Sequence, residues 1–296
     1  MGLANKLFTA QRIFKEKGVS GILSTFNERI RELPAHLHEW WWAEHPLVGR
    51  IVEWRGNIVR ADGLSFSVDH PAITRGVKAL FLLNRYETPE RDALRTCIDP
   101  TLPVVELGAS IGVISCLTNK KLLDPSKHVV VEANPDLIPL LEANRQRNDC
   151  RFTVLHGAVS YSGREVEFLI SDSILASSAT RMDSRFNVRR KVKVPSITLR
   201  EIIERFDFPR CTLVCDIECG EVELVAQEIG TIENHVSTIL MEIHNTTLDK
   251  QTVDAMVEAL NDAGFILAHR LRKTYVFTRS QNERRGSIAT VSGAYS

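Results

Sequence analysis

The chain has 296 residues, of which 44% are hydrophobic and 25% are charged, and its formal net charge at pH 7 is zero. This composition is typical of a globular protein with one large core, and the lack of net positive charge argues against a nucleic-acid partner. No apolar run reaches the ~18 residues that a membrane span requires, and the N-terminus lacks the features of a signal peptide. We therefore expect a soluble, cytoplasmic protein.

The six cysteines form no C-x-x-C pair. Cys211, Cys215 and Cys219 are spaced by four residues, which is not the spacing of the usual zinc sites, although zinc binding there is an alternative. We expect free thiols, wholly or partly buried, in a reducing compartment.

The first part of the chain, residues 5–33, has apolar residues at helical spacing with Lys and Arg between them, and it predicts two helical pieces. Trp40, Trp41 and Trp42 follow. A basic amphipathic helix with nearby aromatic residues can bind a membrane surface. We favour instead packing against the main domain or against a second copy of the chain, as in a homodimer.

Residues 50–69 contain short stretches typical of β-strands, separated by Gly56 and by the Asp62-Gly63 pair. We expect residues 1–83 to form the N-terminal helices and a small β accessory region, and residues 84–279 to form the main domain. Residues 280–296 are polar and rich in small residues, which predicts a flexible tail.

From residue 103 onward, apolar stretches alternate with amphipathic ones, which predicts a parallel sheet covered by helices on both faces. The last two strands have a short connection and should form an antiparallel hairpin. The expected fold is thus a doubly wound, mostly parallel α/β sheet. Its predicted strands are 103–108, 128–133, 152–159, 165–170, 212–218, 237–243, 264–270 and 273–278, and its predicted helices are 112–122, 136–148, 196–206, 220–229 and 250–262.

Ligands of open α/β sheets bind at the carboxyl ends of the strands. The first predicted strand of the sheet ends in E-L-G-A-S-I-G, from Glu106 to Gly112, and runs into a helix. Gly108 permits a sharp turn, and Gly112 permits close approach of helix and sheet. The dinucleotide fingerprint requires glycine where Ser110 stands, which argues against NAD or FAD.

Glu132 closes the next apolar strand, roughly 20 residues after Gly112, where an acidic residue can accept hydrogen bonds from both ribose hydroxyls of an adenosine. The loop from His156 to Val159 follows the third strand, and its small residues Gly157 and Ala158 leave room for a flat ring. Together these features predict a cofactor that contains a nucleoside.

Short motifs follow one another between residues 84 and 245: NRYETPERDAL, VVELGASIGVIS, VVVEANPDLIPLLEANRQRN, HGAVS, VEFLIS, VPSITLREII, LVCDIECGEVELV and ILMEIH. In this order and spacing they resemble the FkbM family of methyltransferases. The resemblance implies the class I methyltransferase (Rossmann-like) fold, S-adenosylmethionine as methyl donor, and O-methylation of a hydroxyl on a sugar, glycan or natural product. The implied partner is a small-molecule or glycan acceptor.

The resemblance also implies roles by position. The glycine turn would hold the methionine part of the cofactor together with the Tyr-Glu pair, the acid at the second strand would hold the ribose, and Ala158 would border the adenine. The implied cofactor site comprises Tyr86, Glu87, Glu106, Gly108, Ala109, Ser110, Gly112, Glu132, Ala133, Asn134, Ala158 and Asp216.

Three positions depart from the family pattern. Glu106 replaces an Asp at the end of the first strand, which keeps the charge, and Arg200 replaces an Asp at the start of a helix. In the motif D-x-E-G-x-E, Cys219 takes the place of the glycine. Gly220 follows it, so the turn could form in a shifted position.

Methyl transfer to a hydroxyl requires alignment, exclusion of water and a group that accepts the proton. Asp216 and Glu218 end one predicted strand, Glu242 and His244 end the next, and residues two apart on a strand share a face. His244 is the preferred base, because the pKa of a free imidazole is nearest neutrality. Asp216 is the second candidate, and Glu242 could hold the imidazole.

Other interpretations remain open for these residues. The four side chains could bind magnesium or manganese, although the pattern leads us to predict no metal, or they could be solvated strand ends. The basic stretch 178–193 could be a lid or a contact for an anionic acceptor, and a solvated loop is slightly favoured. The basic residues in it are Arg181, Arg185, Arg189, Arg190, Lys191 and Lys193.

Two other classes of function are alternatives. A nicotinamide-dependent oxidoreductase would retain NAD. A non-catalytic binding protein with this fold would be consistent with Cys219, and its Asp216→Ala and His244→Ala variants would behave like the wild type.

Overall fold

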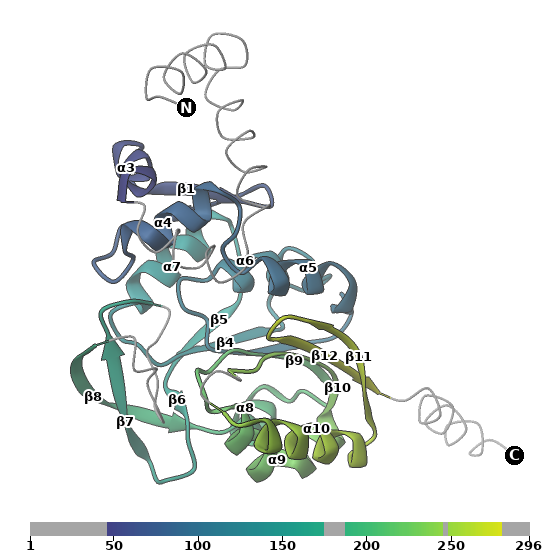
Figure 1. Cartoon of the computed structure of the whole chain (residues 1–296). Coiled ribbons are helices and arrows are strands. Elements are labelled where there is room, and N and C mark those ends of the chain that lie inside the picture. The colour runs from purple at the N-terminus through teal and green to yellow at the C-terminus, as the bar shows by residue number, and fades with distance from the viewer. Residues whose placement is uncertain (1–45, 175–186, 245–247, 280–296) are drawn as a thin grey trace, which may run out of the picture. The chain divides into compact units, whose positions relative to one another are not determined.

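The computed structural model describes residues 46–174, 187–244 and 248–279 (Figure 1). The helices predicted at 5–33, the tryptophan run and the tail predicted at 280–296 lie outside the described residues. In the ranges that are described, no helix is long and apolar enough to cross a membrane.

The chain separates into two compact units. One unit contains the residues up to Val59 together with Thr74–Tyr86, and the other contains Arg60–Ile73 and the residues from Glu87 onward. In the first unit, α3 (Pro46–Trp54) and α4 (Arg75–Leu82) are linked by the carboxylate of Glu53, which lies 3.0 Å from Arg75 Nε.

The strand predicted from residue 50 is wrong, because the residues up to Trp54 belong to α3. Val48, Ile51 and Val52 stand at helical spacing, and Val52 is buried. β-Branched residues favour strands, but the packing of an apolar face overrides this preference. The next two stretches do form strands, β1 (Ile58–Ala61) and β2 (Leu64–Ser67), which pair as a two-stranded sheet.

The second unit contains a seven-stranded sheet in the order β11-β12-β10-β9-β3-β4-β5. Strands β10, β9, β3, β4 and β5 are parallel, whereas β12 is antiparallel to both of its neighbours. The predicted doubly wound sheet with an antiparallel C-terminal hairpin is therefore confirmed. The strands are β3 (Val104–Leu107), β4 (His128–Glu132), β5 (Thr153–His156), β9 (Cys211–Cys215), β10 (Val236–Glu242), β11 (Phe265–Leu271) and β12 (Thr274–Arg279).

Helices cover both faces of this sheet (Figure 1). Successive side chains on a strand point to opposite faces, so Leu213 of β9 joins one apolar cluster and Val214 joins the other. The first cluster includes α8 (Leu199–Phe206), α9 (Glu221–His235) and α10 (Lys250–Asp262), and the second includes α5 (Thr88–Cys97) and α6 (Val113–Asn119). Helix α7 (Ile138–Arg147) connects β4 to β5, and α4 and α5 lie where the sequence pattern predicted no element.

A smaller sheet in the same unit has the order β6-β8-β7, with β6 (Ala158–Val159), β7 (Glu165–Ser171) and β8 (Val188–Ile197). The single strand predicted at 152–159 is wrong, because the chain leaves the central sheet at Gly157 and β6 pairs with β8. The predicted helix at 196–206 begins only at Leu199, since β8 extends to Ile197.

Strand β8 lies in the basic stretch for which a loop was the favoured interpretation. Its lysines and arginines are exposed, so the sequence of this strand lacks a clear alternation of apolar and polar residues. The extended backbone is stabilised by pairing with β7. Arg190 lies 2.5 Å from Asp136, and Lys191 lies 2.7 Å from Glu167. These two side chains therefore have acidic partners within the protein. Residues 175–186, which include Arg181 and Arg185, lie outside the described residues.

Candidate active site

A cleft of about 700 Å³, open to solvent at its mouth, lies at the carboxyl ends of β3, β4, β5 and β9. This is the edge where open α/β sheets bind ligands. Its lining brings together several of the predicted cofactor residues, namely Gly108, Ser110, Glu132, Ala133, Ala158 and Asp216.

The turn after β3 brings the chain against the end of β9. Gly108 has a φ of +88°, and a Cβ added there would lie 1.7 Å from the carbonyl oxygen of Asp216. A side chain at this position is excluded both by backbone conformation and by space. The next turn residue, Ser110, also has a positive φ of 50° and directs its amide toward Glu132.

The carboxylate of Glu132 is held between two turns. Its Oε2 accepts a hydrogen bond of 2.6 Å from the amide of Ser110, and its Oε1 accepts one of 2.7 Å from the amide of Asn134. Burial raises the pKa of Glu132 to about 7, although the hydrogen bonds from these amides oppose the shift. The side chain is 6% exposed and lines the cleft, as an acceptor for a ribose must.

The part of the cleft next to β5 is apolar. Ala133 and Ala158 leave space there, and Phe168 and Ile174 supply apolar surface from β7 and the residues after it. Small residues beside an aromatic wall fit a flat ring. Asn134 does not line the cleft; it is buried and caps the following turn by accepting a hydrogen bond of 3.0 Å from the amide of Asp136.

A second, smaller hollow shares Gly108 and Asp216 with the cleft. Its other walls include Glu87, Ala109 and Glu90. Burial raises the pKa of Glu90, and Thr274 donates a hydrogen bond to its carboxylate. Acidic walls of this kind suit a positively charged group such as the amino group of methionine.

Other predicted cofactor residues have structural partners. Glu106 lines the smaller hollow, but its Oε1 accepts a hydrogen bond of 2.5 Å from Ser115 and its Oε2 lies 3.2 Å from His128 Nε2. Gly112 precedes α6 with a φ of +85°. Tyr86 belongs to the first unit, where it is buried and stacks on Phe81 with ring centroids 4.0 Å apart.

The strand predicted at 212–218 ends early, because β9 stops at Cys215. Glu218 and Cys219 have positive φ angles of 49° and 77°, whereas Gly220 has a φ of −89°. The turn is therefore not shifted to the following glycine. Cys219 itself adopts a left-handed conformation, in which glycine, the residue of the family motif at this position, is favoured.

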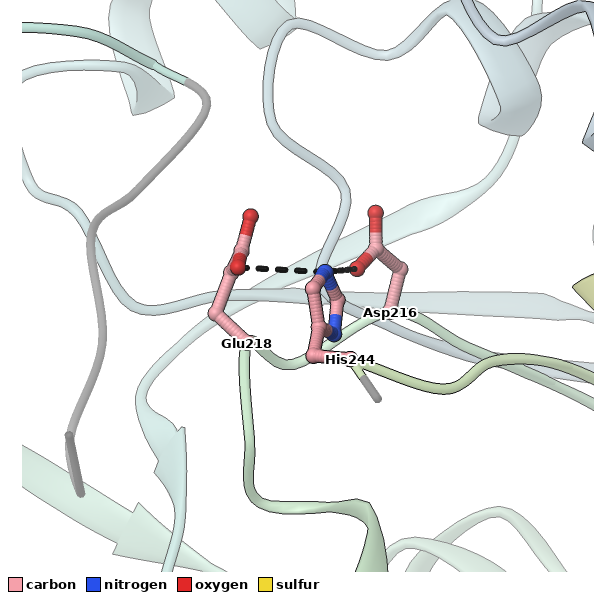
Figure 2. A group of neighbouring side chains, drawn as sticks. All are labelled: Asp216, Glu218 and His244. Carbon is pink, nitrogen blue, oxygen red and sulfur yellow. Dashed lines mark ion pairs between the residues drawn. The ribbon is translucent and has the colours of Figure 1, made fainter. Parts of the chain in front are cut away.

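His244 follows β10 and lies among carboxylates that come from two strand ends (Figure 2). Its Nε2 is 3.1 Å from Glu218 Oε2 and 3.7 Å from both Asp216 Oδ1 and Glu242 Oε1. The structure thus brings together the four predicted catalytic residues. They meet through the turn after β9 and the end of β10, and not through a shared strand face.

The protonation of this cluster differs from that of free side chains. Burial alone would lower the pKa of His244, but the hydrogen bond to Glu221 and the charges of Glu218, Glu221 and Glu242 raise it to about 9. Burial, with the neighbouring carboxylates, raises the pKa of Asp216 well above its usual range. His244 is therefore an imidazolium near neutral pH, and the argument for it as the base from its free pKa does not hold in this environment.

Glu221, which was given no role from the sequence, orients the imidazole. It is the first residue of α9, it is fully buried, and its Oε1 lies 2.9 Å from Nδ1 of His244. The signal in the sequence is its position as the last acid of the motif D-x-E-C-G-E, directly before an apolar helix. An acid buried at that place requires a partner.

The strand order, the glycine turn after β3 and the acid at the end of β4 define a class I methyltransferase fold with a nucleoside-cofactor site. The methyltransferase FkbM domain family matches residues 106–267. The chain belongs to this family, and the protein is an S-adenosylmethionine-dependent methyltransferase.

Comparison with known proteins gives further likenesses. Among solved structures, a precorrin-6y methyltransferase from Geobacter metallireducens has 12% identity and a TM-score of 0.38, over 72% of this chain and 91% of that one. An O-methyltransferase from Bacillus cereus, solved with SAH, has 10% identity and a TM-score of 0.40, over 66% of this chain and 81% of that one. No curated protein matches the chain.

The described residues fit S-adenosylmethionine. The cleft and the smaller hollow meet at Gly108 and Asp216, which matches an elongated molecule with a nucleoside at one end and an amino acid at the other. Ser110 Oγ and Asp216 Oδ1 are buried and have no hydrogen-bond partner among the described residues. Both side chains lie in the lining of the cleft, where a polar ligand would satisfy them.

Proposed function

We propose that the protein methylates a hydroxyl oxygen of a sugar, glycan or natural product. The observation that carries this proposal is the convergence of Asp216, Glu218 and Glu242 on one side of His244, where the cleft meets the smaller hollow. A hydroxyl must lose its proton as the new bond to oxygen forms. A free amine attacks through its lone pair without prior loss of a proton, so a cluster of carboxylates favours a hydroxyl acceptor.

In this proposal the residues of the cleft hold the cofactor. Glu132 accepts hydrogen bonds from the ribose, with Ala133 beside it, and Ala158 borders the adenine. Gly108, Ser110, Gly112, Ala109 and Glu87 surround the methionine part. When bound there, S-adenosylmethionine supplies a methyl group that is activated by the positive charge of the sulfonium.

The cluster has two tasks in the reaction. Its carboxylates accept the proton of the hydroxyl, and a positioned proton acceptor is worth about 10²- to 10⁴-fold in rate. His244, held by Glu221, is a positioning residue whose positive charge keeps the carboxylates together. Near neutral pH, the buried acceptor is therefore a carboxylate and not the imidazole.

The test begins with the cofactor. The full-length protein is titrated calorimetrically with S-adenosylmethionine, with NAD as control and Glu132→Ala alongside. We expect micromolar binding of S-adenosylmethionine, weakened at least about tenfold in Glu132→Ala through loss of hydrogen bonds to a charged group, and no binding of NAD. Retention of NAD would favour an oxidoreductase instead.

The acceptor is then sought by formation of S-adenosylhomocysteine with sugars and natural products, each paired with its deoxy and amino counterparts. We expect turnover with the hydroxyl compound and none with the deoxy compound, and a loss of about 100-fold or more in Glu242→Gln. Asp254→Asn, an exposed residue of α10, is the matched control. Transfer to the amino compounds alone would contradict the proposal.

A further inference from the structure

Three possible ligand atoms converge in the cluster of Figure 2. One carboxylate oxygen from each of Asp216 and Glu218 and one ring nitrogen of His244 lie within 4.8 Å of one another. The nitrogen, Nε2, is 3.1 Å from the Glu218 oxygen and 3.7 Å from the Asp216 oxygen. In an octahedral site with bonds of ~2.1 Å, adjacent ligand atoms are about 3 Å apart and opposite ones about 4 Å. The two distances from Nε2, 3.1 Å and 3.7 Å, fall within this range for ligands of one cation.

The imidazole is oriented as in many metal sites. A histidine that binds a metal through one ring nitrogen usually donates the N–H of the other to a carboxylate. His244 has this arrangement, because Nδ1 lies 2.9 Å from Oε1 of the fully buried Glu221 and Nε2 faces the other carboxylates. Glu221 thus occupies the place of the outer contact of a metal-binding histidine, and a cation at Nε2 would replace the proton that the imidazolium carries there in the metal-free protein.

The cluster also has unused buried acceptors. Oδ1 of Asp216 and Oε2 of Glu221 are both buried and have no hydrogen-bond partner among the residues that the structure describes. The Glu221 side chain is fully buried, and leaving a buried acceptor unsatisfied costs about 1–3 kcal/mol. Four carboxylates, including Glu218 and Glu242, surround the one imidazole of His244. A divalent cation would supply positive charge to this cluster and a partner for Oδ1 of Asp216.

We propose that Asp216, Glu218 and His244 bind one divalent cation of the hard class to which Mg²⁺ and Mn²⁺ belong. The inference deepens the proposed function and rests on it, because Asp216 lines both the cleft and the smaller hollow. A cation held by these residues would polarise the acceptor hydroxyl. The O–H bond then breaks and its proton passes to Glu242, while the O–CH₃ bond forms and the S–CH₃ bond of the donor breaks.

The binding test uses Mn²⁺ as the probe. The full-length protein is freed of metal with a chelator and titrated with Mn²⁺, and free Mn²⁺ is followed by electron paramagnetic resonance. We expect one Mn²⁺ per chain with a Kd below about 100 μM, weakened at least about tenfold in both Asp216→Asn and Glu218→Gln. Asp254→Asn, whose carboxylate is exposed on α10, should bind Mn²⁺ like the wild type.

A spectroscopic signature identifies the ligand without any variant. Pulsed electron paramagnetic resonance of Mn²⁺ on the wild-type protein should show coupling to one imidazole nitrogen, and this coupling should vanish in His244→Ala. Absence of the nitrogen coupling would overturn the proposal, as would Mn²⁺ binding that Asp216→Asn and Glu218→Gln leave unchanged. Thermal unfolding of each variant, measured alongside, shows whether it is folded.

The two proposals fail in different ways. Methyl transfer to a hydroxyl that continues at the same rate in the presence of the chelator would overturn the metal site and leave the proposed function intact. Tight Mn²⁺ binding with the nitrogen coupling, but with methyl transfer only to amines, would support the metal site and contradict the hydroxyl acceptor. Transfer to a hydroxyl that stops with the chelator and returns with Mg²⁺ or Mn²⁺ supports both.

Discussion

Nδ1 of His244 lies 2.9 Å from Oε1 of Glu221, so the second residue after β10 contacts the first residue of α9. This contact connects two segments that follow neighbouring strands of the sheet. It also fixes which ring nitrogen faces Asp216, Glu218 and Glu242. The orientation of the candidate site therefore depends on one buried pair.

Glu221→Gln should lower both the stability and the pKa of His244. The change removes a charge that raises this pKa to about 9, and it weakens a buried hydrogen bond to a charged group, which costs about 2 kcal/mol. The stability that this imidazolium contributes is present below its free pKa of 6.5 and is lost as the pH rises through about 9.

The Glu221→Gln prediction is checked in metal-free protein by urea unfolding at pH 7 and by a nuclear magnetic resonance titration of the His244 ring. Glu223→Gln, on the same helix but exposed, is the matched control and should change neither quantity. A pKa of His244 that stays near 9 in Glu221→Gln would contradict the role given to Glu221.

Gly108→Ala should destabilise the fold and abolish binding of S-adenosylmethionine. An added Cβ would lie 1.7 Å from the carbonyl oxygen of Asp216, at a φ of +88°. We expect a loss of more than about 3 kcal/mol in the free energy of unfolding, measured with urea. Gly63→Ala has nearly the same φ, +86°, with no atom near the added Cβ, so it should cost only about 1 kcal/mol of backbone strain. Equal losses in the two variants would contradict the steric argument.

Glu132 should make stability fall as the pH rises toward neutrality. Its pKa is raised from 4.5 to about 7, so the folded state holds the proton more tightly than the unfolded state. The protonated side chain of Glu132 therefore contributes about 3 kcal/mol to the free energy of unfolding below pH 4.5. This stabilisation is lost as the pH rises through about 7. Glu132→Gln cannot titrate and should gain this amount relative to the wild type over the same range. Urea unfolding of both proteins at several pH values measures the difference, and a constant difference would refute the assignment.

Cys219→Gly should stabilise the turn after β9. Cys219 has a φ of 77°, which costs a residue with a Cβ about 1–2 kcal/mol, while glycine adds unfolded-state entropy of about 0.5–1 kcal/mol. The expected gain is thus up to about 1 kcal/mol in the free energy of unfolding. Cys219→Ala keeps the Cβ and should show no gain. A glycine variant that is no more stable than the alanine variant would mean that the turn has another conformation in solution.

The layered fold could be predicted from the sequence, and so could the strand ends at which the candidate cofactor site lies. Strands such as Val104–Leu107 and His128–Glu132 carry valines on both faces, which predicts that both faces are covered, as in a parallel sheet flanked by helices. Gly108 and Glu132 then follow the ends of adjacent strands, and adjacent parallel strands end at the same edge. The local sequence pattern was sufficient to predict the positions of Gly108 and Glu132, because one follows its strand directly and the other is the last residue of its strand.

The tertiary structure alone decided the elements whose stability comes from distant partners. Half of the residues of strand β8 are Arg, Lys or Ser, and the strand forms because β7 pairs with it. Helix α3 contains β-branched residues typical of strands, and it forms because one apolar face is buried. Neither the pairing nor the burial can be read from the segment itself.

The geometry of the candidate catalytic cluster also depends on the tertiary structure. The sequence pattern predicted that Asp216, Glu218, Glu242 and His244 lie at the ends of neighbouring strands. However, the strand that begins at Cys211 ends at Cys215, before the two acids that follow it. The left-handed turn at Glu218 and the buried carboxylate of Glu221 set the distances and the protonation of His244. Charges act through space, so the pKa of this imidazole depends on packing that no spacing along the chain reveals.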